Sequence, residues 1–144
     1  MPLAWEADVT PVLRRALADG KTLALPLCDV DSTPKRMTLR RVEALQDLVP
    51  GAYGIPEPSG TAEVIPVTAV DLMLVPLEGI DATGMRLGKG GGYYDRLLDG
   101  ATVHTLGCAM SWQWVPEGIP AQPWDRSLNA CADATGIRIF NHLK

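Results

Sequence analysis

The amino-acid sequence predicts an α/β fold of three layers, in which helices cover both faces of a mainly parallel sheet. Continuous apolar runs, such as residues 22–28 and 71–77, are typical of strands that are covered on both faces. Strand-like and helical segments also alternate along the chain, which favours parallel pairing through crossover connections. The chain has 144 residues, enough for one domain that spans residues 1–144 and has a core of its own.

The individual elements follow from local patterns, taken in chain order. Residues 1–4 are expected to be the end of a first strand. A helix is expected to begin at Thr10, as its N-cap, because Pro11 suits the first helical position, and Gly20 is a suitable stop. Residues 50–59 are rich in proline and glycine and are expected to form a loop. Further strands are expected at residues 22–28, 37–41, 71–77, 103–110 and 137–140.

Composition and charge argue against several classes of protein. Hydrophobic residues make up 47% and charged residues 21% of the chain, as in a globular protein that is soluble in water. A net charge of −4 without a basic tract argues against nucleic acid as the main ligand. No membrane span and no export signal are recognisable, so a cytoplasmic location is expected. The three cysteines lack Cys-x-x-Cys spacing, which argues against zinc.

Residues 86–96, Arg-Leu-Gly-Lys-Gly-Gly-Gly-Tyr-Tyr-Asp-Arg, carry the strongest functional signal of the sequence. Glycines can adopt positive φ, so successive backbone N–H groups of this loop can point at one anion. A helix expected to start at Tyr93 also favours an anion at its N-terminus. Asp95 is placed to hold a divalent cation against a polyphosphate. We therefore predict that nucleotide phosphates are bound by Arg86, Gly88, Lys89, Gly90, Gly91, Gly92, Tyr93, Tyr94, Asp95 and Arg96.

Better-known glycine loops do not account for this string. A P-loop requires Gly-x-x-x-x-Gly-Lys-Ser/Thr, whereas Gly90 follows Lys89 in this chain. A dinucleotide fingerprint that starts at Gly88 would require a glycine where Tyr93 stands. A flexible surface hairpin is the remaining alternative, and the concentration of cations, tyrosines and an aspartate in so short a stretch argues against it.

The whole string resembles the signature of the 5-formyltetrahydrofolate cyclo-ligase family, whose members are also called methenyltetrahydrofolate synthetases. The resemblance extends from about residue 3 to residue 140 and implies the Rossmann-like fold of the cyclo-ligases. It is poor near Asp133, where the family usually has a threonine after two β-branched residues. The other matching segments, in the same order as in the family, are Glu6-Ala-Asp-Val-Thr10-Pro, Gly54-Ile-Pro-Glu-Pro58, Val75-Pro-Leu, Asp81-Ala-Thr-Gly84, Ile119-Pro120 and Pro123-Trp-Asp125.

The resemblance also implies binding sites for two substrates and a metal ion. The glycine loop would bind ATP, with Arg86 and Lys89 as the catalytic cations. Mg²⁺ would be held by Asp95 and Asp125, since this ion prefers one or two carboxylates together with phosphate oxygens and water. A flat pterin ring needs a stacking face and an acceptor for its N–H groups. The folate pocket would be lined by Glu6, Met37, Tyr53, Glu57 and Tyr93.

Each of these residues also has an ordinary structural interpretation. The cations can be solvated surface charge, Arg96 most readily because it lies one turn into a helix. Asp125 can cap the segment that follows it, and Met37 can fill the core. Tyr53 can anchor its loop, and Glu57 can stand exposed in a turn.

Under the family interpretation, the protein is an ATP-dependent ligase of one-carbon metabolism. It would cyclise 5-formyltetrahydrofolate to 5,10-methenyltetrahydrofolate: the formyl oxygen attacks the γ-phosphate, N10 closes on the activated carbon, and phosphate leaves. One alternative is a non-catalytic relative that binds folate or nucleotide. A second alternative is a different ATP-using ligase or kinase on the same scaffold. A third is a generic protein that binds nucleotide phosphates.

The N-terminus departs from the family pattern. Members begin with further helices that carry Lys and Arg, and this chain is expected to lack them. The short form is therefore expected to turn over poorly, because electrostatic stabilisation is the main catalytic term in phosphoryl transfer. Its partners are expected to be ATP and folate, with neither nucleic acid nor membrane. It is expected to be a monomer, or a dimer in which a second copy covers the shortened strand.

Overall fold

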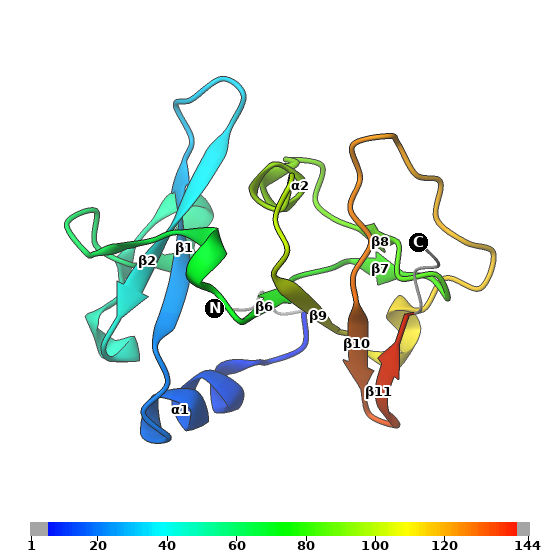
Figure 1. Cartoon of the computed structure of the whole chain (residues 1–144), viewed down its shortest axis with the longest axis horizontal. Coiled ribbons are helices and arrows are strands. Elements are labelled where there is room, and N and C mark those ends of the chain that lie inside the picture. The colour runs from blue at the N-terminus through cyan, green and yellow to red at the C-terminus, as the bar shows by residue number, and fades with distance from the viewer. Residues whose placement is uncertain (1–5, 141–144) are drawn as a thin grey trace. The chain divides into compact units, whose positions relative to one another are not determined.

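The computed structural model describes residues 6–140, whose contacts form two compact units (Figure 1). The first unit comprises residues 8–69, and the second comprises residues 70–140 together with Glu6 and Ala7. Each unit contains a helix and strands, so the predicted α/β class is confirmed. The strand expected at residues 1–4 lies outside the described residues. Within residues 6–140, no helix is long and apolar enough to cross a membrane.

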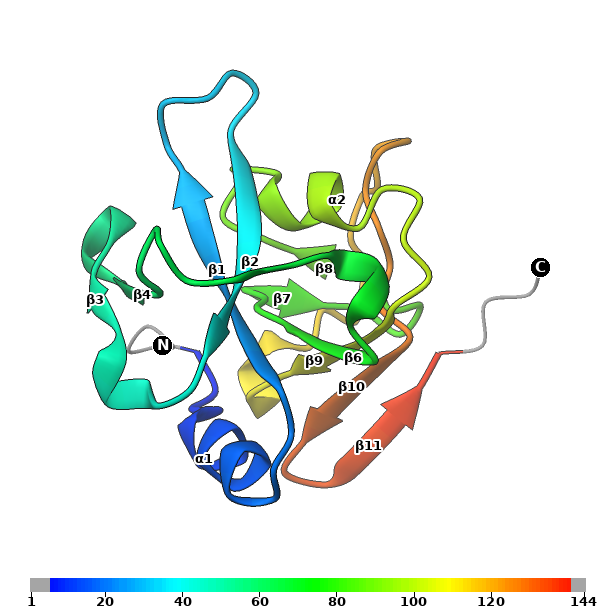
Figure 2. The ribbon, with the colours of Figure 1, turned by 60° about the vertical axis from the view of Figure 1, so that its left-hand side comes forward.

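An antiparallel sheet forms the centre of the first unit (Figure 2). Its two long strands pair along their whole length, from Leu23 opposite Val42 to Asp29 opposite Arg36. Two short strands form a separate antiparallel pair within residues 49–57. The strands of this unit are β1 (Leu23–Asp29), β2 (Arg36–Val42), β3 (Val49–Pro50), β4 (Pro56–Glu57) and β5 (Val64–Ile65), and the sheet order is β1-β2-β5.

The antiparallel pairing corrects the expectation of a mainly parallel sheet around residues 22–28. Only Leu23 of β1 is buried, and most of the strand is half-buried, so the apolar run is not covered on both faces. The connection to β2 comprises only residues 30–35. A parallel crossover needs about a dozen residues or more, so this short connection permits antiparallel pairing only. An apolar run indicates a shielded strand but not the direction of its neighbour.

The helix of the first unit, α1 (Thr10–Ala18), begins where the sequence predicts, but with a different cap. Its N-cap is Val9, and the backbone N–H of Thr10 donates to Asp8 Oδ1 across 2.9 Å. Leu13 is its buried residue, and Gly20 follows its end at φ +71°. The 3₁₀ helices of the chain are η1 (Leu45–Asp47), η2 (Ala52–Gly54), η3 (Val67–Ala69) and η4 (Ser111–Gln113).

A mixed sheet of four strands forms the second unit, in the order β11-β10-β9-β6 (Figure 1). Three strands are parallel, and the last is antiparallel to its neighbour. The structure confirms the strands predicted at 71–77, 103–110 and 137–140, whereas β10 was not predicted. Ala-Cys-Ala-Asp lacks the β-branched and aromatic residues that mark strands. The strands are β6 (Leu72–Val75), β9 (His104–Cys108), β10 (Ala130–Asp133) and β11 (Gly136–Ile139).

The core of the second unit lies against this sheet. Its most deeply buried side chains are those of Ile80, Leu128 and Cys131. Gly107 in β9 makes this packing possible, because a Cβ there would lie 2.7 Å from Leu77 Cδ2 and 2.8 Å from Leu128 Cδ1. The sheet and its core thus form a close-packed support for the segments between β6 and β9.

A hairpin and a short helix occupy the chain between β6 and β9. The hairpin strands are β7 (Gly79–Ile80) and β8 (Arg86–Leu87), and the helix is α2 (Tyr93–Leu97). The carboxylate of Asp81 organises the hairpin turn, because Oδ1 accepts from the backbone N–H of Thr83 and of Met85. Its Oδ2 accepts from the backbone N–H of Ile119, 38 residues away, across 2.9 Å. These bonds fix the backbone directly before Arg86.

Candidate functional site

The glycine loop connects β8 to α2, and two of its glycines have positive φ. Gly90 and Gly92 have φ of +82° and +64°, conformations that side chains with a Cβ rarely adopt. Gly88 is needed for a different reason, since a Cβ there would lie 2.7 Å from Arg86 Nη1. The loop therefore combines unusual backbone geometry with space for a buried arginine.

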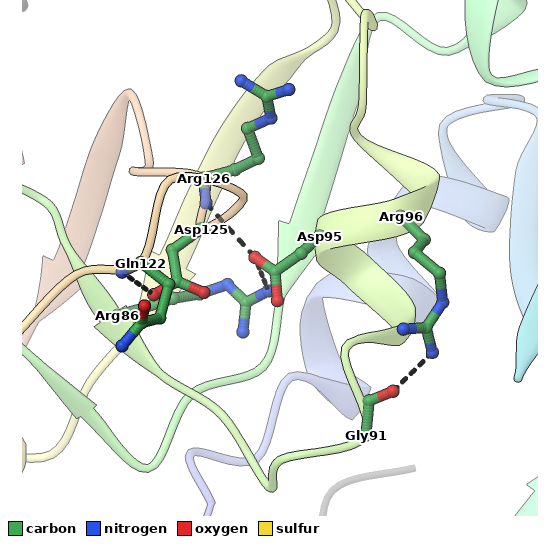
Figure 3. Close-up of polar contacts among 7 residues, drawn as sticks. All are labelled: Arg86, Gly91, Asp95, Arg96, Gln122, Asp125 and Arg126. Carbon is green, nitrogen blue, oxygen red and sulfur yellow. Dashed lines mark hydrogen bonds and ion pairs between the residues drawn. The ribbon is translucent and has the colours of Figure 1, made fainter. Parts of the chain in front are cut away.

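Arg86 is the most buried cation of the loop, with a side chain that is only 6% exposed. Its Nη2 donates to Asp95 Oδ1 across 3.1 Å (Figure 3). Its guanidinium carbon lies 5.8 Å from the centroid of the Tyr94 ring. Its Nε is buried and has no hydrogen-bond partner within the described chain. An unpaired buried donor costs roughly 1–3 kcal/mol, more for a charged group, so this nitrogen is a donor that a ligand oxygen can satisfy.

The two carboxylates predicted to hold a metal ion come from adjacent segments. Asp95 Oδ1 also accepts from the backbone N–H of Arg126 across 3.2 Å, so residue 125 lies next to α2 (Figure 3). Asp125 Oδ2 accepts from the backbone N–H of Gln122 across 2.7 Å, which stabilises a local turn. The second oxygen of each carboxylate makes no hydrogen bond to residues 6–140.

This donor set fits Mg²⁺ that is held jointly with a polyphosphate. In the described part of the chain there is no cluster of three metal-ligating side chains, so a cation here would need ligand oxygens in addition to Asp95 and Asp125. Mg²⁺ has this habit, since it usually keeps several waters and binds one or two carboxylates plus phosphates. The pair is therefore suited to a metal that arrives with a nucleotide.

Lys89 is paired with the glutamate that the sequence assigns to folate. Its Nζ lies 3.0 Å from Glu6 Oε1, with the Lys89 side chain 43% exposed and that of Glu6 13% exposed. Two residues that were predicted to contact different substrates thus contact each other. A ligand that attracts either side chain has to compete with this ion pair.

Arg96 folds back onto the glycine loop. Its Nη2 donates to the backbone carbonyl of Gly91 (Figure 3). Its guanidinium carbon lies 5.8 Å from the centroid of the Tyr93 ring. A Cβ at Gly92 would lie 2.7 Å from Arg96 Nη1. The side chain therefore braces the loop, in addition to the positive charge that it brings.

The remaining predicted folate residues belong to the first unit and differ in exposure. Met37 is buried in β2, where it packs in the core. Glu57 is buried too, and both of its carboxylate oxygens accept hydrogen bonds from backbone N–H groups, those of Cys28 and Ala52. Tyr53 is 64% exposed, and Lys35 Nζ donates to its hydroxyl across 3.0 Å. Only the tyrosine among these three presents its side chain to solvent.

Two further residues support the site without having been singled out as functional. Arg126 binds Asp95 through its backbone and pairs with Asp99 through its guanidinium. Asp81 is buried, which opposes its ionisation, but its hydrogen bonds from Thr83, Ile119 and Met85 outweigh burial and hold its pKa below the ordinary value. The Asp-x-Thr-Gly pattern at 81–84 is a recognisable turn signal that could have identified Asp81.

The cysteines show no sign of nucleophilic activation. Burial, together with the neighbouring Glu57, raises the pKa of Cys28 to about 11. Burial also raises the pKa of Cys131 to about 11 and raises that of Cys108. Because the thiolate is the reactive form, all three thiols are poor nucleophiles near neutral pH.

Fold and site together define a class: an α/β protein in which a cationic glycine loop enters a short helix that carries a paired aspartate. The model of the 5-formyltetrahydrofolate cyclo-ligase family matches residues 1–132. The chain belongs to this family of ligases, which confirms the resemblance found in the sequence.

Relatives and solved structures agree with this assignment. The 5-formyltetrahydrofolate cyclo-ligase of Escherichia coli K12 is 32% identical over 129 residues, a match that covers 87% of this chain and 70% of the relative. The enzyme of that name from Mycolicibacterium smegmatis is 37% identical over 131 residues, covering 87% of this chain and 66% of the relative. The chain thus spans about two thirds of the length of these relatives.

An NMR structure of Aquifex aeolicus 5,10-methenyltetrahydrofolate synthetase superposes with a TM-score of 0.81 at 33% identity, covering all of this chain and 71% of that one. A synthetase of that name from Mycoplasma pneumoniae has a TM-score of 0.67 at 23% identity, covering 91% and 68%, and shares the fold.

Proposed function

We propose that this chain binds Mg²⁺-ATP at the glycine loop and uses it to cyclise 5-formyltetrahydrofolate to 5,10-methenyltetrahydrofolate. Membership of the family supports the reaction class. The observation that carries the proposal for this chain is the buried Arg86–Asp95 pair, with its unsatisfied Nε, beside a loop of positive-φ glycines. Such an arrangement suits an oxygen-rich anion that completes the hydrogen bonding of the guanidinium.

In the proposed reaction, the formyl oxygen attacks the γ-phosphorus and ADP leaves. N10 then attacks the activated formyl carbon and loses its proton, and the formyl oxygen departs with the phosphate. The protein supplies position and charge stabilisation, which is the main contribution of enzymes to phosphoryl transfer. Arg86 and the backbone N–H groups of the loop would stabilise the charge on the phosphoryl oxygens, and no side chain is needed as a nucleophile.

Asp95 and Asp125 would hold the metal ion that accompanies ATP. Mg²⁺ supplies charge neutralisation to the phosphates when it is bound. Asp95 would serve two purposes in this scheme, since Oδ1 orients Arg86 and Oδ2 faces no competing donor among residues 6–140. Asp125 would complete the carboxylate pair from the segment that Asp95 anchors through the Arg126 backbone.

Lys89 would exchange partners when nucleotide binds. The Lys89 side chain is 43% exposed, and its Nζ lies 3.0 Å from Glu6 Oε1. A phosphate carries more negative charge than a carboxylate and would attract the lysine. The exchange would release Glu6 Oε1 from Lys89, and this oxygen would then accept from an N–H group of a pterin ring. Tyr93, which belongs to the same unit as Glu6, would supply an aromatic face to that ring.

A direct assay tests the proposal. The purified chain is mixed with 5-formyltetrahydrofolate and Mg²⁺-ATP, and the methenyl product is followed by its absorbance. We expect product only when ATP and Mg²⁺ are both present. Binding of both substrates by calorimetry without any product would contradict the catalytic proposal and indicate a binding protein.

The metal assignment has a test of its own. Asp95→Asn and Asp125→Asn should each weaken the support that Mg²⁺ gives to ATP binding, by about tenfold if one charge-assisted contact is lost. Asp71→Asn is a matched control, because Asp71 is exposed and far from the glycine loop in sequence. Wild-type Mg²⁺ dependence in both site variants would make the two aspartates structural.

A further inference from the structure

One loop of the first unit holds an exposed aromatic ring on a strained backbone. Tyr53, in η2, has φ +57° and ψ 21°, and it is the one residue other than glycine with positive φ within residues 6–140. A bulky side chain seldom adopts this left-handed conformation. Strain of this kind persists where the surrounding contacts impose it. The residues around Tyr53 must therefore supply such contacts.

The carboxylate of Glu57 makes two such contacts. Oε2 accepts from the backbone N–H of Ala52, directly before Tyr53, across 3.1 Å. Oε1 accepts from the backbone N–H of Cys28 in the long strand β1, across 3.2 Å. The side chain is buried, with the residue 6% exposed. Glu57 therefore ties the residue before Tyr53 to the sheet.

Residue 51 has to be glycine because of the Glu57 carboxylate, and not because of its backbone conformation. Its φ of −122° and ψ of −162° are open to any residue. A Cβ at Gly51 would nevertheless lie 2.3 Å from Glu57 Oε2 and 2.5 Å from its Cγ. The glycine is needed because Glu57 occupies that space.

Other bonds of the loop agree with a fixed presentation of the ring. The backbone N–H of Gly51 donates to the Ile55 carbonyl across 3.1 Å, and that of Ile55 donates to the Ala52 carbonyl across 3.0 Å. Lys35 Nζ donates to the Tyr53 hydroxyl and lies 5.6 Å from the ring centroid. Both the backbone and the ring of Tyr53 are thus held while the side chain stays exposed.

We propose that Glu57 is a positioning residue, which presents the Tyr53 ring as a preformed stacking surface for a planar heteroaromatic ligand. Glu57 acts through the backbone and does not touch the ligand, because its two oxygens are engaged and its side chain is buried. The inference rests on the proposed function, in which the planar ligand is the pterin ring of the folate substrate. A preformed surface lowers the ordering entropy that binding would otherwise lose.

Two substitutions disturb the carboxylate in different ways. In Glu57→Gln, an amide N–H₂ replaces one oxygen and faces a backbone donor, so one hydrogen bond is lost. Gly51→Ala leaves the carboxylate in place but displaces it with a Cβ. Both should raise KM for 5-formyltetrahydrofolate about tenfold, with KM for ATP and kcat changed less than twofold. Gly60→Ala is the matched control, since a Cβ there meets nothing within 4 Å, and it should leave all constants unchanged.

A double-mutant cycle separates positioning from direct contact. In a Tyr53→Ala background, Glu57→Gln should change KM for the folate less than twofold further, because the ring that Glu57 positions is already absent. If the two effects instead multiply, Glu57 acts on the ligand by another route and the proposal is overturned. Thermal denaturation of each variant shows whether the folded fraction is comparable.

Hydrogen exchange on the ligand-free protein tests the geometry without reference to folate. The amides of Ala52 and Cys28 should exchange faster in Glu57→Gln than in the wild type and in Gly60→Ala. Unchanged exchange at both amides would refute the role of Glu57, whatever the protein binds. Faster exchange in a protein that binds no 5-formyltetrahydrofolate would support the Glu57–Tyr53 relation and refute the proposed substrate.

Discussion

The Gly51–Glu57 loop of the first unit and the glycine loop of the second use acidic side chains in different ways. Glu57 is buried and receives backbone N–H groups at both of its oxygens. Glu6 instead contacts the side-chain cation Lys89, and Asp95 contacts the Arg86 guanidinium as well as the backbone N–H of Arg126. A backbone donor can leave only if the loop rearranges, whereas a side-chain cation can change partners by rotating. We therefore expect the first loop to keep its shape, and the side-chain contacts of the second loop to change when a ligand binds.

Arg86→Met should give the largest effect, because Arg86 is the most buried cation of the glycine loop. The substitution removes the guanidinium, which donates to Asp95 through Nη2 and whose Nε has no hydrogen-bond partner within residues 6–140. Loss of a donor that stabilises developing charge costs roughly 10²–10³-fold in kcat. We expect a drop of this size in methenyl formation with Mg²⁺-ATP.

Arg86→Lys is the companion to this variant. It keeps the positive charge but loses the planar fork, so its activity should lie between those of the wild type and Arg86→Met. Turnover within threefold of the wild type in Arg86→Met would show that the buried pair is structural, like Glu57.

Lys89→Ala should have the next largest effect. A charge-assisted hydrogen bond is worth about 1.5–3 kcal/mol, so nucleotide affinity should fall roughly 10- to 100-fold. Lys21→Ala, at an exposed lysine of the first unit, serves as the control. Unchanged ATP affinity in calorimetry would remove Lys89 from the phosphate site.

Local patterns in the sequence predict much of this architecture and of the glycine loop. Apolar runs identify β1, β6 and β9, and glycine content identifies the loop that Gly90 and Gly92 shape with positive φ. The strand β10 was missed because its residues are small, and it is a strand through its pairing with β9 and β11. Pairing of this kind is decided by tertiary contacts.

The partners of the charged residues could not be predicted from the sequence. Glu57 stands in a Pro-rich segment that indicates a loop, yet its carboxylate is captured by β1, 29 residues earlier. Lys89 was assigned to phosphates as a cation of the glycine loop, and Glu6 was assigned to folate through the family resemblance. Nothing in their spacing indicates that the two side chains meet. Such partners depend on how distant segments pack, which no local pattern records.

Asp81, in the hairpin that precedes the glycine loop, resembles Glu57 in that its carboxylate accepts from backbone N–H groups. Hydrogen bonds hold its pKa below the ordinary value of 3.8 against the opposing effect of burial. A depressed folded-state pKa contributes stability above 3.8, and this stability is lost as the pH falls through the folded-state pKa. Thermal denaturation between pH 7 and pH 2 should show a decline that begins near pH 4.

Asp81→Asn should remove part of this acid sensitivity and lower the free energy of unfolding at pH 7 by ~1–3 kcal/mol, because a buried N–H loses its acceptor. Asp47→Asn, at an exposed aspartate of the first unit, is the control. An identical acid profile in Asp81→Asn and the wild type would assign the pH dependence to other groups.

Glu6→Gln should have the smallest effect and the opposite sign. The Lys89–Glu6 pair is partly exposed, and such pairs are worth about 0.2–1 kcal/mol. If Lys89 must leave Glu6 to reach a phosphate, removing the carboxylate charge should raise ATP affinity about 1.4- to 5-fold. Folate affinity should fall in the same variant, because an acceptor for the pterin N–H groups is weakened.

Calorimetry of ATP and folate binding to Glu6→Gln shows whether Lys89 leaves Glu6 when ATP binds or is held in place by it. Glu63→Gln is a matched control, since Glu63 pairs with Arg41 in the first unit and should leave both affinities unchanged. Weaker ATP binding in Glu6→Gln would mean that Glu6 holds Lys89 in its binding position. The pair would then belong with Glu57 among the contacts that keep a shape, and the contrast between the two loops would rest on Arg86 and Asp95 alone.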